Sequence, residues 1–263
     1  MDIATIVGLI LGIFLIGGSM FLAGLSSGLS VINFWSLESL MVVLGGTLSA
    51  TAIAFRLNEV KRVFGLIKFV FIKPAFELDE VVEDIVNLGE AYRKDRQSLE
   101  AQAANLKNRF LKDGVVFITQ GLKLEDLREI MTTREDYRER REASEAGLMK
   151  TLGTYSPAFG MVGTLIGLIM MLLGMGSSDG GDMAAQLGQS MSLALITTFY
   201  GAVLANLLFL PFAEKISSRN RENTVCGELT IEGLTLIHQK KHPIVIRDML
   251  NSYIPPGLRK REE

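Results

Sequence analysis

Threonine side chains lie inside two long apolar stretches, residues 157–175 and 189–212. Thr164 is in the first stretch, and Thr197 and Thr198 are adjacent in the second. Hydroxyl oxygens can replace part of the water shell of a small cation inside a channel, so the three residues are candidates for an ion path. The alternative is structural, because a hydroxyl inside an apolar helix often bonds only to a carbonyl of its own helix.

Small residues accompany these hydroxyls at helical spacing. Residues three, four and seven positions apart share one side of a helix. The two faces defined in this way consist of Pro157, Gly160, Thr164 and Gly167, and of Ser190, Ala194, Thr197 and Gly201. Small faces let helices approach closely, so close packing of the two stretches explains the glycines equally well.

No titratable side chain lies near the middle of either stretch. The nearby acids are at the ends of apolar stretches or in loops, and both histidines are near the C-terminus: Asp2, Glu38, Asp179, Asp182, Glu214, His238 and His242. Ion carriers and proton relays normally place an ionisable group inside the membrane. If this chain moves ions, a second polypeptide must therefore supply the carboxylate.

The sequence does not support an enzyme. The apolar stretches offer no general base for serine chemistry and no paired carboxylates for aspartyl chemistry. The HExxH and CxxC metal motifs are absent, and so is the GxxxxGK[ST] phosphate-binding loop. We expect no catalytic residues, no bound metal and no cofactor.

The distribution of charge shows which elements hold these residues. All 27 Lys and Arg residues lie between positions 56 and 150 or between 215 and 261, and none lies in 1–55 or 151–214. A helix of about 20 apolar residues crosses roughly 30 Å of hydrocarbon. The two zones without cations therefore predict four membrane-spanning helices, at residues 3–25, 34–55, 157–175 and 189–212.

The cations also predict the orientation. Basic residues stay on the cytoplasmic side, which places both termini inside and the loops at 26–33 and 176–188 outside. A cleaved signal peptide is the alternative for the first span, but Met1 and Asp2 provide no basic n-region. The single cysteine, Cys226, excludes an intrachain disulfide, and a net charge of −2 gives no support for nucleic-acid binding.

These features predict an all-α integral membrane protein with four parts. Spans one and two occupy 1–55, a helical cytoplasmic domain 56–150, spans three and four 151–214, and a helical cytoplasmic tail 215–263. Within the second part, Leu78, Val81, Val82, Ile85 and Leu88 recur at helical spacing, as do Leu122, Leu124, Leu127, Ile130 and Met131. The charged run 135–145 predicts a solvated helix with i,i+4 ion pairs.

Two segments resemble the MotA/PomA family of flagellar stator subunits. They are SPAFGMVGTLIGL at 156–168 and ALITTFYGAVLANLLFLPFAEKI at 194–216. The resemblance extends over nearly the whole chain. TolQ and ExbB proteins share the last two spans but have three spans in all, so the apolar N-terminal pair of spans favours the stator branch.

The resemblance implies a mechanism. In that family a ring of five such subunits surrounds two copies of a MotB/PomB-type partner in the bacterial inner membrane. The partner's single span carries the aspartate that accepts the ion, and ion flow turns the ring. The cytoplasmic insert then acts on the rotor protein FliG.

The resemblance also implies roles for single residues. Pro157 and Pro211 correspond to the family's two span prolines, which link ion binding to the cytoplasmic insert. Arg93, Lys94 and Glu100 correspond to charges that contact FliG, although residues 95–98 and Ala101 depart from the family's pattern.

The resemblance also bears on the ion. Sodium-driven members carry hydroxyls at the positions of Thr164, Thr197 and Thr198, which favours sodium over protons here. The alternatives are a proton-driven stator, a TolQ/ExbB-like energiser of an outer-membrane process and an unrecognised membrane enzyme.

Overall fold

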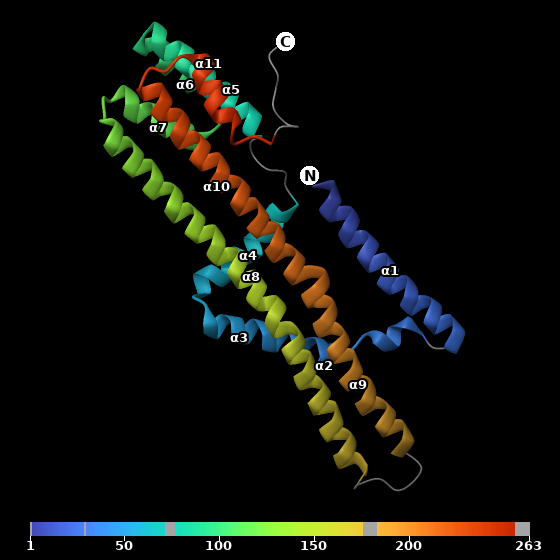
Figure 1. Ribbon diagram of the computed structural model, residues 1–263. Helices are drawn as coiled ribbons and strands as arrows, with labels where there is room; N and C mark the ends of the chain where they lie inside the picture. The colour runs from blue at the N-terminus through green and yellow to red at the C-terminus, as the bar shows by residue number, and fades with distance from the viewer. Residues whose placement is uncertain (1, 29, 72–76, 176–182, 256–263) are drawn as a thin grey trace. The chain divides into compact units, whose positions relative to one another are not determined.

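The computed structural model describes residues 2–28, 30–71, 77–175 and 183–255, and helices make up nearly all of these ranges (Figure 1). In chain order the helices are α1 (Ile3–Ser27), η1 (Val31–Phe34), α2 (Leu37–Leu40), η2 (Met41–Gly45), α3 (Gly46–Ala54), α4 (Leu57–Val70), α5 (Leu78–Lys94), α6 (Arg96–Ala104), α7 (Arg109–Thr119), α8 (Leu124–Met175), α9 (Met183–Val203), η3 (Leu204–Phe209), α10 (Leu210–His238) and α11 (Pro243–Asn251). The described ranges contain no strand, which confirms the predicted all-α class. Most of the loop predicted at 176–188 and the end of the tail, 256–263, lie outside the described residues.

Four helical segments are long and apolar enough to span a membrane, as the sequence predicted. They are Ile3–Ser26, Ile32–Ala54, Leu124–Met175 and Met183–His238. The last two greatly exceed the roughly 20 residues that a bilayer requires. Their apolar parts contain the predicted spans 157–175 and 189–212, and their polar parts continue into the charged region of the chain.

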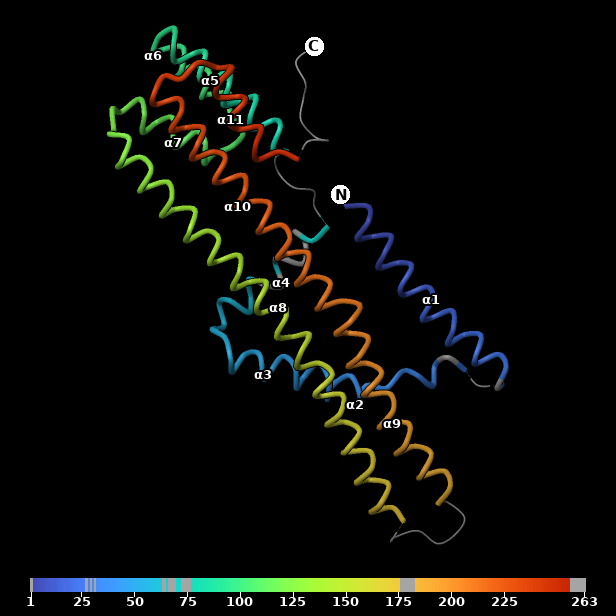
Figure 2. Tube along the Cα trace, viewed as in Figure 1, coloured from blue at the N-terminus to red at the C-terminus, as the bar shows by residue number. Residues whose placement is uncertain are grey.

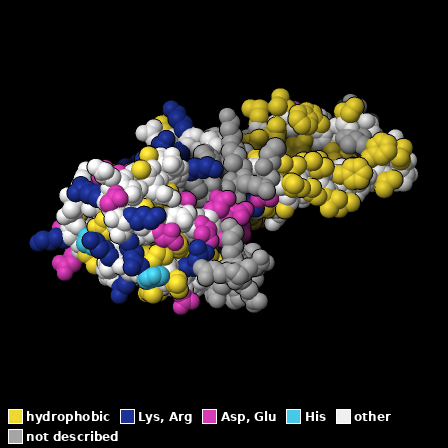
Figure 3. Space-filling model, turned by 90° about the horizontal axis from the view of Figure 1, so that it is seen from above, with side chains coloured by type: hydrophobic (Ala, Val, Ile, Leu, Met, Phe, Trp, Pro, Cys, Tyr) yellow, Lys and Arg dark blue, Asp and Glu magenta, His cyan; other side chains and the backbone are white. Residues whose placement is uncertain are grey.

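The chain forms two compact units. The first consists of Met1–Lys73 and Ser144–Ser217, and the second of Pro74–Ala143 and Ser218–Glu263. Hydrophobic side chains gather over one part of the surface and charged side chains over the other (Figure 3). Compact units do not mark the surfaces of a bilayer, so the boundaries predicted from charge, after residues 55, 150 and 214, stay predictions.

In the first unit, α8 and α9 run side by side and the second span packs against them (Figure 2). The second span is not one regular helix, because the π-helical segment η2 separates α2 from α3. A second π-helical segment, η3, follows α9. Single π-turns inside longer helices are uncommon and are often found at functional sites.

Helix α1 is largely exposed, with no buried position in its apolar window, and this exposure fits a lipid-facing helix. Its N-terminal end is anchored by polar contacts within the first unit. The Asp2 carboxylate pairs with the Lys215 ammonium, and the Asp2 N–H donates to the Phe71 carbonyl at 3.0 Å. Gly12 allows close contact with the Leu207 side chain.

The second unit has a core of apolar side chains from α5, α6, α7, α8, α10 and α11. The predicted face of α5 is buried there, since Ile85 and Leu88 are fully inaccessible to solvent, and α8 contributes Leu127 and Met131. Polar side chains define several helix starts. Asp95 caps α6, Asn108 caps α7 and His242 caps α11 by accepting hydrogen bonds from backbone N–H groups, which satisfies donors that a helix leaves unpaired.

Candidate functional site

The site predicted from the threonines lies where α8 and α9 touch most closely. A Cβ atom on Gly201 would lie 2.7 Å from the Ser156 carbonyl oxygen, and one on Gly167 would lie 2.7 Å from the Ser190 carbonyl oxygen. Neither position has room for a side chain, because backbone atoms occupy the space. The glycines therefore serve the close helix packing that the sequence left open as an explanation.

Thr164 of α8 and Thr198 of α9 meet across this contact. Their Oγ1 atoms are 2.5 Å apart. The Gly160 carbonyl oxygen lies 3.2 Å from the Thr164 hydroxyl and 3.4 Å from the Thr198 hydroxyl. The Ala194 carbonyl oxygen lies 3.3 Å and 3.4 Å from the same two hydroxyls. Four oxygen atoms thus converge at one point between two apolar helices.

Thr197 is oriented differently from its neighbour. Its side chain is fully buried and its hydroxyl lies 3.0 Å from the Leu193 carbonyl oxygen and 2.8 Å from that of Ala194, both on its own helix. It also packs against the position of Gly163. The structure therefore brings two of the three predicted threonines together. Thr164 and Thr198 also lie within hydrogen-bond distance of a carbonyl of their own helix, as Thr197 does, but only Thr197 has no contact with another of these hydroxyls.

The hydroxyl pair opens onto an apolar surface. Thr164 is partly buried and Thr198 is exposed. The large side chains of Met161, Leu165 and Leu195 around them are all more than half exposed. In a membrane such a surface is covered by lipid or by another helix, so a partner helix placed here would bring its own groups within reach of the four oxygens.

Two further polar residues bond neighbouring helices near this site and were not predicted from the sequence. The Ser156 hydroxyl is fully buried and donates to the Gly201 carbonyl at 3.2 Å. The Tyr200 hydroxyl donates to the Phe34 carbonyl at 2.6 Å and accepts from the Ser36 N–H at 3.2 Å, which ties α9 to the start of the second span. Both residues are polar and lie in or beside an apolar stretch, and this sequence feature could have identified them as candidates.

Neither predicted coupling proline terminates its helix. Pro157 lies inside α8, where its missing N–H leaves the Gly153 carbonyl without the usual helical donor. Pro211 is the second residue of α10, which begins where η3 ends and continues to His238. η3 includes Leu207, whose carbonyl would accept the i→i−4 hydrogen bond that Pro211 cannot donate.

The predicted rotor-contact residues are on the second unit. Arg93 and Lys94 are exposed in the last turn of α5, and Glu100 is exposed on α6. Asp95 caps α6 between them by accepting from the Ser98 N–H at 2.6 Å. Hydrogen bonds from Ser98 hold the pKa of the Asp95 carboxyl below its usual range.

Glu100 has a neighbour that the prediction overlooked. Its carboxylate pairs with the Arg96 guanidinium at 3.4 Å, and the four-residue spacing of the two residues was the signal. Both side chains remain more than half exposed, so the pair is weak and leaves Glu100 accessible to another protein.

Known proteins resemble this chain over its full length. Residues 102–226 match the MotA/TolQ/ExbB proton channel family. The chain is 30% identical to the chemotaxis protein PomA of Vibrio alginolyticus, and the alignment covers 100% of this chain and 99% of PomA. The flagellar MotAB stator complex of Bacillus subtilis has a chain with a TM-score of 0.81 and 28% identity, covering 94% of this chain and 96% of that one. C. jejuni MotAB has the same fold, with a TM-score of 0.85 at 21% identity over 100% of both chains.

Proposed function

Because this chain belongs to the MotA/TolQ/ExbB proton channel family, within its MotA/PomA branch, we propose that it is a flagellar motor stator subunit that uses sodium ions. Members of this family are ion channel subunits and not enzymes. The observation that carries the sodium proposal is the meeting of the Thr164 and Thr198 hydroxyls at 2.5 Å.

Sodium must exchange part of its hydration shell for protein oxygens, whereas a proton needs only a carboxylate and a chain of water. The two hydroxyls and the carbonyl oxygens of Gly160 and Ala194 supply oxygens at a single point. Each carbonyl has two lone pairs, so it can keep its helical hydrogen bond and face a cation once the threonine hydroxyl turns its hydrogen away.

The remaining ligand comes from a partner. Residues 151–175 and 183–213 contain no acidic side chain. A MotB/PomB-type partner would place an aspartate in its single span against the exposed apolar surface around Thr198. We propose that five copies of the chain surround that partner in the inner membrane, with both termini in the cytoplasm.

Torque would reach the rotor protein FliG through the second unit. The exposed charges of Arg93, Lys94 and Glu100 offer the contact, since exposed charges guide docking at little cost to stability. The full-length match to PomA favours this role over a TolQ/ExbB-like energiser of an outer-membrane process.

The test is rotation speed against sodium concentration at constant membrane potential and pH. Thr164→Ala and Thr198→Ala each remove one oxygen ligand. A neutral polar contact contributes about 1 kcal/mol, so each variant should need roughly fivefold more sodium for half-maximal speed. Thr154→Ala is the matched control, because the Thr154 hydroxyl is exposed and bonds only the Lys150 carbonyl on its own helix.

Two results would count against the proposal. Unchanged speed of the natural chain in sodium-depleted medium would leave a proton-driven stator. Unchanged sodium dependence in both threonine variants, with rotation intact, would place the ion ligands elsewhere.

A further inference from the structure

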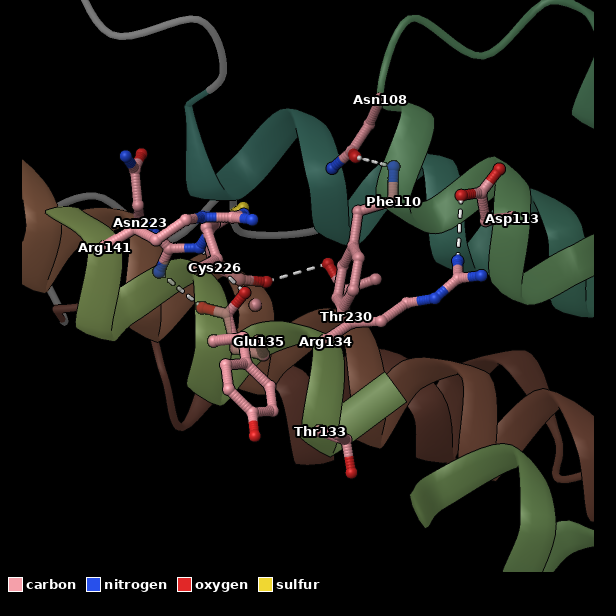
Figure 4. A pocket seen from close by; sticks show the side chains of 13 residues that line it. Asn108, Phe110, Asp113, Thr133, Arg134, Glu135, Arg141, Asn223, Cys226 and Thr230 are labelled. Carbon is pink, nitrogen blue, oxygen red and sulfur yellow. Dashed lines mark hydrogen bonds and ion pairs between the residues drawn. The ribbon is translucent and has the colours of Figure 1, made fainter. Parts of the chain in front are cut away.

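The second unit contains a cavity that the stator function does not use. It has a volume of about 620 Å³ and lies among α7, α8 and α10 (Figure 4). Pockets for small organic ligands typically measure about 300–1,000 Å³ and combine apolar walls with a few directed polar groups. Phe110, Tyr137 and Cys226 form apolar parts of the wall. The polar groups include Asn108, arginines of α8, and the carboxylates of Asp113 and Glu135, which pair with Arg134 and Arg138.

Asn108 directs an unused hydrogen-bond donor into this cavity. Its Oδ1 atom accepts from the Phe110 N–H at 3.0 Å and from the Leu111 N–H at 3.2 Å. Because both partners are donors, the other end of the carboxamide must be the nitrogen. The residue is only 6% exposed, and its Nδ2 donates to no group in the described part of the chain. In Figure 4 this end is turned away from α7.

Three arginines of α8 at i, i+4 and i+7 line the cavity: Arg134, Arg138 and Arg141. They differ in the carboxylates with which they form ion pairs. The Arg134 guanidinium pairs with the Asp113 carboxylate at 3.0 Å, and Arg138 pairs with Glu135 and Glu142 at 2.5 and 2.6 Å. Arg141 lines the same cavity but pairs with no carboxylate among the residues that the structure describes. Its planar guanidinium is suited to a phosphate or carboxylate group.

We propose that this cavity is a binding site for a small organic anion, with a phosphate or carboxylate group held by Arg141 and Asn108. The apolar walls accept the organic part of the ligand, because the volume exceeds that of an isolated phosphate. The start of α7 favours an anion as well, since the partial positive charge of that helix lies at its N-terminal end. None of the residues that line the cavity belongs to the proposed ion path or to the proposed rotor contact.

The test is direct binding to the purified full-length chain in lipid nanodiscs, measured by isothermal titration calorimetry. The probes are adenosine monophosphate, citrate and inorganic phosphate. Saturable binding of adenosine monophosphate or citrate, stronger than that of inorganic phosphate, is the expected result. The comparison of the two organic probes shows whether the site prefers phosphate or carboxylate.

Two variants remove the proposed contacts without disturbing the fold. Asn108→Asp keeps the oxygen that caps α7 but replaces the amide donor by a negative charge. Arg141→Gln removes an exposed guanidinium. Hydrogen bonds to charged groups imply that each change weakens binding about tenfold to hundredfold.

Arg128→Gln is the matched control, since Arg128 is an exposed cation of the same helix that does not line the cavity. This variant should bind the probes as the natural chain does. Absence of saturable binding for all three probes overturns the proposal. Equal affinities in the natural chain and in the Asn108 and Arg141 variants overturn it as well.

Discussion

The charged cluster between α8 and α10 allows a quantitative prediction about the second unit. The Arg138 guanidinium binds the Glu135 carboxylate in a bidentate manner, with Nε to Oε2 at 2.8 Å and Nη2 to Oε1 at 2.5 Å. It also reaches α10, where Nη1 lies 3.4 Å from the Asn220 Oδ1 and Nη2 lies 3.2 Å from the Thr224 hydroxyl. The Glu135 side chain is only 7% exposed.

Replacing Arg138 by methionine would leave the Glu135 carboxylate buried without its cation. Loss of one partner from a buried ion pair costs about 3–5 kcal/mol, and hydrogen bonds to charged groups contribute about 1.5–3 kcal/mol. The Arg138 side chain is 23% exposed, so water can enter the vacated space and reduce the cost. We therefore expect a local loss of stability of about 2–3 kcal/mol.

Hydrogen exchange of the full-length chain in nanodiscs measures this loss. Backbone amides of α8 and α10 around the cluster should exchange roughly 30- to 160-fold faster in Arg138→Met, because each 1.4 kcal/mol is a factor of ten. A second replacement, Glu135→Leu, removes the unpaired charge and should restore most of the protection.

The control for this experiment is Arg128→Met. Arg128 pairs with Glu232 at 3.9 Å with its own side chain 55% exposed, so protection should change little. Equal exchange rates in the natural chain and in Arg138→Met would refute the reasoning that this network holds α8 to α10.

Two further predictions concern the threonine contact and the cap of α6. In a Cys226→Ser background, Thr164→Cys combined with Thr198→Cys should form a disulfide on mild oxidation, because the two hydroxyl oxygens are 2.5 Å apart; Thr164→Cys with Thr197→Cys should not, and equal yields in gel electrophoresis would contradict the assigned orientation of Thr197. The lowered pKa of Asp95 means that its contribution to folding is present above the unfolded pKa of about 3.8 and is lost as the pH falls through the folded value. Amide exchange at Ser98 should therefore accelerate below about pH 4 in the natural chain, whereas Asp95→Asn should keep the cap without that pH dependence.

The sequence by itself determined the class of the fold. Each of the four apolar stretches, which are separated by blocks of cations, predicts a helix. A helix pairs its backbone N–H and C=O groups within one segment, and unpaired backbone groups are very unfavourable in hydrocarbon. The helical spacing of Ile85 and Leu88 similarly predicted the buried face of α5, since burial of apolar side chains follows the period of the helix.

The charged run 135–145 shows what the sequence could not determine. Its i,i+4 spacing predicted a solvated helix, and the pair between Arg138 and Glu142 has that spacing. Glu135 and Glu145 are nevertheless buried. Spacing along one helix reports which side chains are neighbours on that helix, but it contains no information about the residues of other helices that lie against them, such as Gly227 of α10 at Glu135 and Arg62 of α4 at Glu145.

The threonines illustrate the same limit at the candidate site. The sequence identified Thr164, Thr197 and Thr198 as hydroxyls in apolar helices and could not separate an ion path from helix packing. The structure shows that Thr164 and Thr198 meet between α8 and α9, whereas Thr197 does not take part in this contact. The sequence could not show this, because residues 164 and 198 are far apart along the chain and their meeting depends on the rotation of two helices about their axes. That rotation is fixed by Gly167 and Gly201, where backbone approaches backbone and no side chain fits.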